Sequence, residues 1–244
     1  MCRRRPFPPV IAIAVVAALA GTTAPARADG PLTATLAATT DYVFRGVSQT
    51  YGTAAIQGGL NYQHPSGWFG GAWASNVEPY PGGRKSTELN LYGGFGWALA
   101  GDWGMRASYT RYLYAWDRRP ARYDYGEIAL ALAFQDKLTF SVAYQPDSTG
   151  YSTVGYSRDR ATAAYEVAAR WPLVGDLALT GGVGYYDLTR LFHASYWAGD
   201  AGLSFVRGHL RVDLTHFVCD GTVRRLYEDA SADGRWVLSA AWRF

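Results

Sequence analysis

The chain is poor in cysteine, which excludes one large class of secreted domains. Among its 244 residues only Cys2 and Cys219 are cysteines, and Cys2 lies in a segment that we expect to be removed. The mature chain then cannot form an intramolecular disulfide. Small secreted domains that depend on disulfides for stability are therefore excluded.

Long apolar runs are also missing after the first 28 residues, where no uninterrupted apolar stretch reaches 18 residues. A transmembrane helix needs about 20 such residues. If the mature chain lies in a membrane, it must cross it as strands, because only helices and closed barrels satisfy their backbone hydrogen bonds in lipid.

The N-terminus has the three parts of a secretory signal peptide. Arg3, Arg4 and Arg5 form a basic region, 10–20 is an apolar run, and Ala26-Arg27-Ala28 has the small-x-small form of a cleavage site. We expect cleavage near Ala28, which divides the chain into a signal peptide, 1–28, and one domain, 29–244.

Positive charge is scarce once this leader is gone. The whole chain has 23 basic and 20 acidic residues, a net charge of +3. The leader carries four of the arginines, so the mature chain has 19 basic residues and a net charge of about −1. A nucleic-acid partner is not expected, because no net positive field remains to attract phosphates.

The mature sequence alternates between apolar and polar residues, the period of a β-strand. The last segment is the clearest, since one of its faces consists of Trp236, Leu238, Ala240, Trp242 and Phe244. Similar segments recur back to a first one at 32–44, twelve in all. The terminal aromatic residue resembles the signal by which the assembly machinery recognises outer-membrane barrels.

The connections between these segments alternate in length. Short turns lie at 64–67, 100–102, 135–137, 172–176 and 206–209, and longer polar links lie at 45–53, 76–86, 114–122, 146–160, 187–195 and 218–234. Six long and five short connections suit an even-stranded barrel with both termini on the periplasmic side. The sequence thus predicts an all-β fold, a transmembrane antiparallel up-and-down barrel of about 12 strands.

One face of each predicted strand is apolar and the other carries polar or charged residues. We expect the polar faces to line a lumen in which charges of both signs are present. The candidate lumen-lining residues are Glu88, Asn90, Arg106, Glu127, Glu166, Arg170, Asp200, Arg211 and Asp213. A narrow pore is one outcome of twelve strands, but it does not follow from the count.

Three stretches near the start of the mature chain carry a family resemblance: DYVFRGVSQT at 41–50, AIQGGLNY at 55–62 and GWFGGAWASNV at 67–77. They resemble the opening of the TorF-type porin family of proteobacteria, formerly a family of conserved hypothetical proteins. ELNLYGG at 88–94, GYYD at 184–187 and the ending at 236–244 fit the same family. The resemblance implies an outer-membrane barrel acting as a porin, with no defined substrate to carry over.

The first of these stretches predicts a contact at the barrel mouth. Its motif residues are Asp41, Tyr42, Arg45, Gly46, Ser48 and Gln49. Asp41 and Arg45 are four apart, so we expect them to form a charge pair that holds the first outer loop against the mouth. The alternative is a solvated pair of little energetic weight. Gly46, Ser48 and Gln49 are turn-forming types, which favours a structural role.

One catalytic arrangement was weighed as an alternative. His193 and Ser195 weakly resemble the His-x-Ser element of outer-membrane lipid A deacylases, with Asp187 or Asp200 as the acid that would orient the imidazole. Tyr196 follows where that family has Asn, so no catalytic residue is assigned and an enzyme is not expected. His64, His193, His209 and His216 lack the spacing of metal ligands, and no cofactor or metal is expected.

Three functions follow, in order of preference. The first is a barrel in the outer membrane of a Gram-negative bacterium that allows passive diffusion of small solutes. The second is a closed or structural barrel that contacts lipopolysaccharide or an adhesive partner, and the third is the lipid A hydrolase. The expected partners are outer-membrane lipid, lipopolysaccharide and, through the C-terminal strand, the barrel-assembly machinery.

Overall fold

The computed structural model describes residues 31–78, 85–114, 124–135, 137–152, 155–227 and 234–244. The expected signal peptide, 1–28, lies outside these residues. Within them, the chain forms one closed antiparallel barrel of twelve strands and a separate two-stranded hairpin. The predicted fold class and strand number are confirmed.

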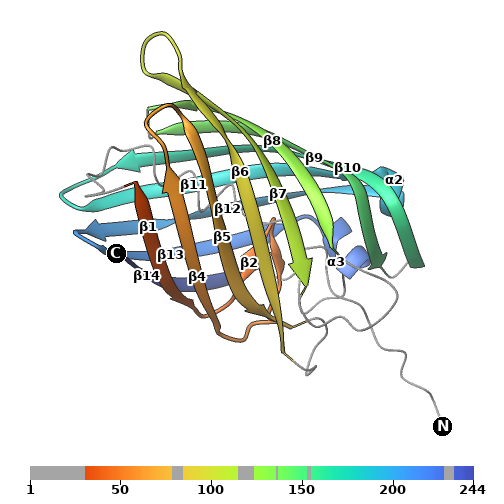
Figure 1. Cartoon of the computed structure of the whole chain (residues 1–244). Helices are drawn as coiled ribbons and strands as arrows, with labels where there is room; N and C mark the ends of the chain where they lie inside the picture. Colours follow the sequence, from red (N-terminus) through yellow and green to blue (C-terminus); the bar gives the residue numbers. More distant parts are fainter. Residues whose placement is uncertain (1–30, 79–84, 115–123, 136, 153–154, 228–233) are drawn as a thin grey trace.

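The barrel strands follow one another around the wall in chain order, and β1 closes the ring against β14 (Figure 1). In that closure Thr35 pairs with Arg243 and Thr39 pairs with Ser239. The barrel strands are β1 (Leu32–Thr39), β4 (Ala55–Gln63), β5 (Trp68–Val77), β6 (Ser86–Ala98), β7 (Trp103–Tyr114), β8 (Tyr125–Phe134), β9 (Leu138–Ser152), β10 (Gly155–Pro172), β11 (Leu177–Leu188), β12 (Ala194–Arg207), β13 (Leu210–Cys219) and β14 (Arg235–Arg243).

The connections differ between the two ends of the barrel. Turns of two to four residues join the strands at one end, such as the turn between β4 and β5 and the turn between β12 and β13. The other end, which we call the long-connection end, carries the longer links and the helices α2 (Thr189–Phe192) and α3 (Gly221–Tyr227) (Figure 1). None of the described helices is long and apolar enough to cross a membrane.

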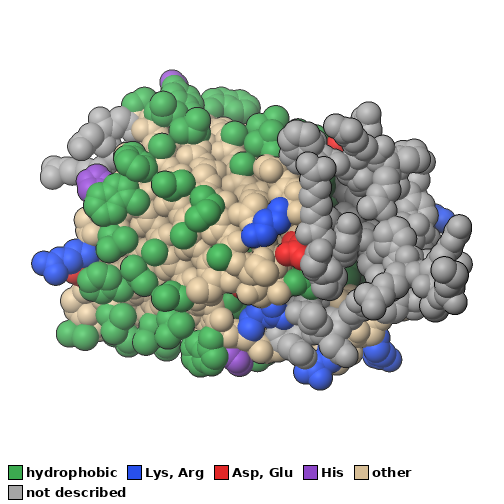
Figure 2. All heavy atoms as spheres, turned by 90° about the horizontal axis from the view of Figure 1, so that it is seen from below, with side chains coloured by type: hydrophobic (Ala, Val, Ile, Leu, Met, Phe, Trp, Pro, Cys, Tyr) green, Lys and Arg blue, Asp and Glu red, His purple; other side chains and the backbone are tan. Residues whose placement is uncertain are grey.

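The outer surface of the barrel is apolar. Leu36, Ile56, Leu60 and Ile128 point outward from β1, β4 and β8, and each exposes more than half of its surface. Figure 2 shows hydrophobic side chains spread over the described wall, while charged side chains lie mainly toward its ends. A belt of this kind is what lipid-facing strands require.

Aromatic side chains form two bands on this outer face. Near the short turns, Trp68 contacts Phe95 edge-on with 5.1 Å between ring centroids. Toward the long-connection end, Tyr185 lies 5.0 Å from Trp197. On β14, exposed Trp242 and Trp236 belong to the two bands and are six residues apart, about 20 Å along a strand. This spacing suits the two interfaces of a bilayer's apolar core.

Three boundaries differ from the sequence prediction. The first strand ends at Thr39 rather than 44, because the chain turns inward there. The expected link at 146–160 is mostly strand, since β9 and β10 continue to pair beyond the neighbouring strands, with irregular register near Arg160. The links at 187–195 and 218–234 contain α2 and α3, which at four and seven residues are too short to produce a helical period.

Candidate functional site: a hairpin inside the barrel

The link between β1 and β4 folds back into the barrel. Residues 40–53, which we call the inner hairpin, contain β2 (Val43–Phe44) and β3 (Val47–Ser48), joined by the two-residue turn Arg45-Gly46. Both turn residues have positive φ, 48° and 79°, as the favoured two-residue hairpin turns require. A non-glycine residue in this conformation is strained, so its surroundings must hold it there.

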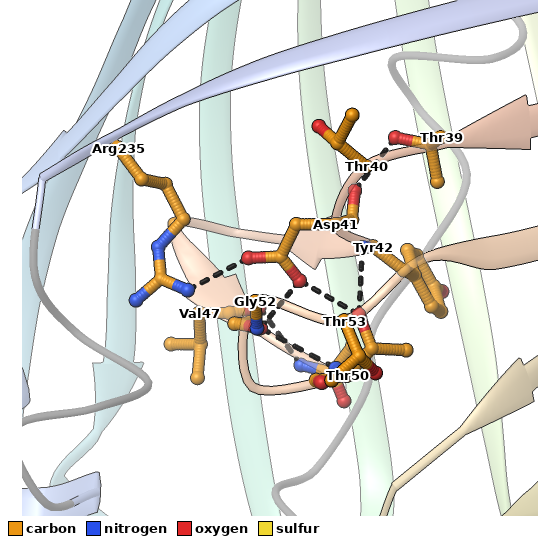
Figure 3. Close-up of polar contacts among 12 residues, drawn as sticks. Thr39, Thr40, Asp41, Tyr42, Val47, Thr50, Gly52, Thr53 and Arg235 are labelled. Atoms are coloured by element: carbon orange, nitrogen blue, oxygen red, sulfur yellow. Dashed lines mark hydrogen bonds and ion pairs between the residues drawn. The ribbon is translucent and has the colours of Figure 1, made fainter.

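Asp41 fixes the base of the inner hairpin. One carboxylate oxygen accepts hydrogen bonds from the hydroxyls of Ser48, at 2.6 Å, and Thr50, at 2.7 Å. The other oxygen pairs with Arg235 of β14 at 2.7 Å, as Figure 3 shows. The Thr39 hydroxyl donates to the Asp41 carbonyl at 2.7 Å. This carboxylate therefore joins both arms of the hairpin to the barrel wall.

Arg45, at the hairpin tip, reaches the opposite part of the wall. Its Nη2 lies 3.3 Å from Oε2 of Glu127 on β8, and its Nε lies 3.3 Å from Oε1 of Glu166 on β10. Only 3% of the Arg45 side chain is exposed. Burial acts to lower the pKa of Arg45, but the two carboxylates outweigh it and raise that pKa above its ordinary value.

These contacts correct the predicted charge pair. Asp41 and Arg45 do not bind each other, and neither is solvated. The hairpin turn places the two side chains at opposite ends, so each finds a partner more than eighty residues away in sequence. The whole predicted motif lies in the inner hairpin, and its side chains are buried rather than exposed at the mouth.

Residues of the wall also donate hydrogen bonds to both carboxylates. Glu127 accepts hydrogen bonds from the Tyr112 hydroxyl at 3.3 Å and from the Gln145 amide at 2.6 Å. Glu166 accepts one from the Tyr186 hydroxyl at 2.9 Å. The Gln145 amide oxygen in turn accepts hydrogen bonds from the hydroxyls of Ser148 and Thr162. Each acid is thus held by the barrel and not by the hairpin alone.

The backbone of the hairpin tip is also bound by the wall. The Tyr196 hydroxyl donates to the Arg45 carbonyl at 3.2 Å, and the Cys219 thiol donates to the Gly46 carbonyl at 3.0 Å. Around the tip lies an apolar cluster that includes Phe44 and Val47 of the hairpin and Phe192 and Tyr227 of the helices. Protein therefore fills the barrel at the long-connection end.

Glu88 lies beside the other arm of the hairpin. Its Oε1 accepts hydrogen bonds from the Asn90 amide at 2.8 Å and from the Tyr42 hydroxyl at 3.5 Å. Its buried Oε2 has no hydrogen-bond partner among the described residues, and no described cation pairs with it. Tyr42 also contacts Trp73 edge-on, with 5.4 Å between centroids.

Three of the remaining candidates make their described contacts elsewhere on the wall. Arg106 lies over the ring of Phe69, 3.9 Å from its centroid, and Arg211 pairs with Asp213 at 2.8 Å. Asp200, half-buried on β12, lies close enough to Glu166 for the two carboxylates to repel each other, and Arg170 is half-buried on β10. Of the nine candidates, the structure brings only Glu127 and Glu166 together with Arg45, and places Glu88 and Asn90 beside Tyr42. That these nine residues line a solute path stays a prediction.

Sequence reasoning missed several groups in this site. Arg235 was placed on the polar face of the last strand but not as the partner of Asp41. Tyr112, Gln145 and Tyr186 were not singled out, because a tyrosine on an alternating strand reads as an interfacial or core residue. A weak signal existed for Gln145, which precedes Pro146 at the end of an apolar run.

The catalytic alternative is not assembled in the described part of the chain. The Ser195 hydroxyl accepts a hydrogen bond from the Tyr185 hydroxyl at 2.8 Å, and the Asp187 carboxylate accepts one from the backbone N–H of Thr189. His193 follows α2 in the left-handed conformation, and among the described contacts its ring forms no hydrogen bond with either side chain. Ser195 shares the outward face of β12 with exposed Trp197.

Solved structures with a similar fold are outer-membrane porins. The chain aligns with the KdgM porin at a TM-score of 0.53 and 7% identity, over 87% of this chain and 99% of that one. It aligns with the NanC porin at a TM-score of 0.51 and 11% identity, over 86% and 98% of the two chains. These likenesses show the fold.

Comparison of the sequence with curated proteins found no match. A family model described as a bacterial protein of unknown function, Gcw_chp, matches residues 23–238. This match spans the described barrel from its first strand into its last. The chain therefore belongs to the Gcw_chp family.

Proposed function

We propose that this protein is a TorF-type porin of the Gram-negative outer membrane that lets small solutes diffuse through its barrel. The observation that carries the proposal is the contrast between the two faces of the wall. The outer face is an apolar belt between two aromatic bands, while charged pairs such as Arg211–Asp213 occupy the inner face. Partly exposed charged pairs on the inner face are typical of the polar, water-filled interior of a porin.

The fold and the sequence resemblance support this proposal from two directions. KdgM and NanC are named porins whose fold is similar to that of this chain, and one of the KdgM structures is of its complex with a disordered oligogalacturonate. The inner charges of this chain are of both signs, so an acidic sugar polymer is not carried over to it. Delivery to the membrane follows from the expected leader, cleaved near Ala28, and from recognition of the C-terminal strand by the assembly machinery.

The inner hairpin lies across the proposed path. Since its tip is hydrogen-bonded to four residues of the wall, diffusion requires these bonds to break and the hairpin to move out of the path. The protein is thus a porin whose path is closed in this structure.

Conductance across a planar lipid bilayer tests the function. We expect stepwise, ion-conducting insertions, with openings that are longer and more frequent for Asp41→Asn than for the wild type. Folding is verified beforehand by the heat-dependent mobility of the barrel in gels. Persistent silence from both folded proteins would refute the porin.

A closed barrel that contacts lipopolysaccharide is the second candidate, and the filled long-connection end favours it. Exposed Arg190, Arg224 and Arg225 lie at that end, where guanidinium groups can bind phosphates. Silent bilayers combined with weaker lipopolysaccharide binding by Arg224→Gln would support this candidate. An unchanged lipid A profile in cells that carry Ser195→Ala would remove the hydrolase.

A further inference from the structure

We propose that the solutes of this porin are small organic cations of the guanidinium or amine class, and that Arg45 occupies their binding site in this structure. The site, which we call the cation site, consists of the carboxylates of Glu127 and Glu166 and the ring of Tyr186. This inference rests on the proposed function, because it names the solute class of the same barrel.

The cation site belongs to the barrel wall, whereas the group that fills it does not. Glu127, Glu166 and Tyr186 come from β8, β10 and β11, and Tyr112 and Gln145 orient Glu127 from β7 and β9. The guanidinium belongs to Arg45 at the hairpin tip, where the backbone is held in an unfavourable conformation with positive φ. Removing the hairpin would leave the acids and their supporting hydrogen bonds in place.

The geometry of the contacts selects the class of ligand. Two different nitrogens of one planar group each meet a separate carboxylate, at 3.3 Å, and the central carbon lies 5.4 Å from the centroid of the Tyr186 ring. Paired acids and an aromatic face are what a guanidinium or ammonium group binds. Among the described residues no group of three acids, histidines or cysteines is placed to hold a metal ion.

The charge balance points the same way. One guanidinium faces two carboxylates, and Nη1 of Arg45 is buried without a hydrogen-bond partner. Glu88, at the other arm of the hairpin, adds a buried carboxylate with an unpaired oxygen. An anion would meet only repulsion here once Arg45 had left.

This arrangement couples opening to the solute. Withdrawing Arg45 alone leaves two buried carboxylates without a counter-ion, which is strongly unfavourable. A cation that enters the site relieves that cost, so it competes with Arg45 and favours the displaced hairpin. A neutral or anionic solute of the same size cannot replace the positive charge of Arg45, so it does not favour the displaced hairpin.

The first experiment measures binding without transport. The Arg45→Ala protein, folded in detergent, is heated with ethylguanidinium or with ethylurea, its uncharged isostere. We expect ethylguanidinium at millimolar concentration to raise the unfolding temperature of this variant by a few degrees, and ethylurea to leave it unchanged. Wild type, whose site is filled, should show no difference between the two.

Two matched variants check that the site is responsible. In the Arg45→Ala background, Glu127→Gln with Glu166→Gln should abolish the stabilisation. Arg106→Ala removes an arginine that faces the Phe69 ring and no acid pair, and it should show no preference for ethylguanidinium. If Arg45→Ala does not fold, Arg45→Gly, which adopts the positive φ of this position without strain and also leaves the site empty, replaces it. Equal effects of both compounds, or stabilisation that survives loss of both acids, would overturn the proposal.

The second experiment measures selectivity in bilayers that separate unequal concentrations of arginine hydrochloride. We expect the reversal potential of open Arg45→Ala channels to follow the arginine cation rather than chloride. Channels that conduct but prefer chloride would overturn the cation proposal and leave the porin standing. Binding of ethylguanidinium by a barrel that never conducts would overturn the porin and, with it, the assignment of a solute.

Discussion

The thiol of Cys219 donates a hydrogen bond to the carbonyl oxygen of Gly46, 3.0 Å away, although the two residues are 173 positions apart in the chain. Cys219 is the last residue of β13, and Gly46 is at the tip of the inner hairpin. The reactivity of this thiol therefore indicates whether the hairpin is bound inside the barrel, because no other cysteine occurs in the described residues.

The first prediction uses that reporter. Displacement of the hairpin should expose Cys219 to a water-soluble maleimide, so Asp41→Asn should be modified faster than the folded wild type. Loss of a hydrogen bond to a charged group costs about 1.5–3 kcal/mol, which raises the displaced fraction about tenfold or more. The rate is followed by mass spectrometry. Equal rates in the two folded proteins would show that the hairpin does not leave.

The second prediction concerns Gly46. A Cβ added there would lie 2.5 Å from both the Ala198 Cβ and the Cys219 sulfur, at a φ of +79°. Gly46→Ala should therefore lower the free energy of unfolding by about 2–4 kcal/mol, from backbone strain and overlap together.

Gly52 provides the matched control for this substitution. It has nearly the same φ, +76°, but an added Cβ would have nothing within 4 Å. Gly52→Ala should cost only the backbone strain, about 1–2 kcal/mol. Urea unfolding in detergent gives both values. A loss at Gly52 as large as that at Gly46 would mean that the tip is not tightly seated.

The third prediction tests the ion pair between Asp41 and Arg235. Because the Asp41 side chain is only 4% exposed, removing the positive charge of Arg235 leaves a buried carboxylate without that counter-ion, at a cost of about 3–5 kcal/mol. Asp41→Asn and Arg235→Gln should each destabilise the barrel, and the double variant should lose much less than the sum of the two. Additive losses in this double-mutant cycle would show that the two side chains do not interact.

The fourth prediction separates assembly from stability at the C-terminus. Phe244 exposes 67% of its surface, so its ring contributes little to the folded barrel. Its backbone N–H donates to the Ala34 carbonyl, a bond that a substitution keeps. Phe244→Ala should therefore unfold within about 0.5 kcal/mol of wild type in detergent.

In cells, the same variant should reach the outer membrane in much smaller amounts, on the hypothesis that the assembly machinery recognises the terminal aromatic residue. Immunoblots of membrane fractions provide the comparison, with Trp242→Ala as a second aromatic position on the same face. Normal membrane levels of Phe244→Ala would remove the terminal residue from the assembly signal.

Most of the barrel could be predicted from local patterns. Alternation over segments such as 236–244 reports a strand with one apolar face, since side chains in a strand point to opposite sides in turn. The count of long and short connections then required an even number of antiparallel strands. Neither argument depends on which residues meet across the lumen.

The interior could not be predicted in the same way. Arg45 looked like a partner of Asp41 because they are near in sequence, yet its partners are Glu127 and Glu166, and Asp41 pairs with Arg235. Contacts across a lumen are set by the curvature of the closed wall and by the inward turn at Thr40, for which an alternating pattern carries no signal. The extended pairing of β9 with β10 was missed for a related reason, because polar strands outside the membrane resemble loops.

The two-residue period and the lengths of the connections were enough to predict the class of fold, its strand number and the apolar belt. The position of residues 40–53 inside the barrel, and the contact of one arginine with two acids there, depend on how the closed chain packs. A closed wall brings together side chains from strands that are far apart in the chain, and the burial of those charges makes their pairing obligatory.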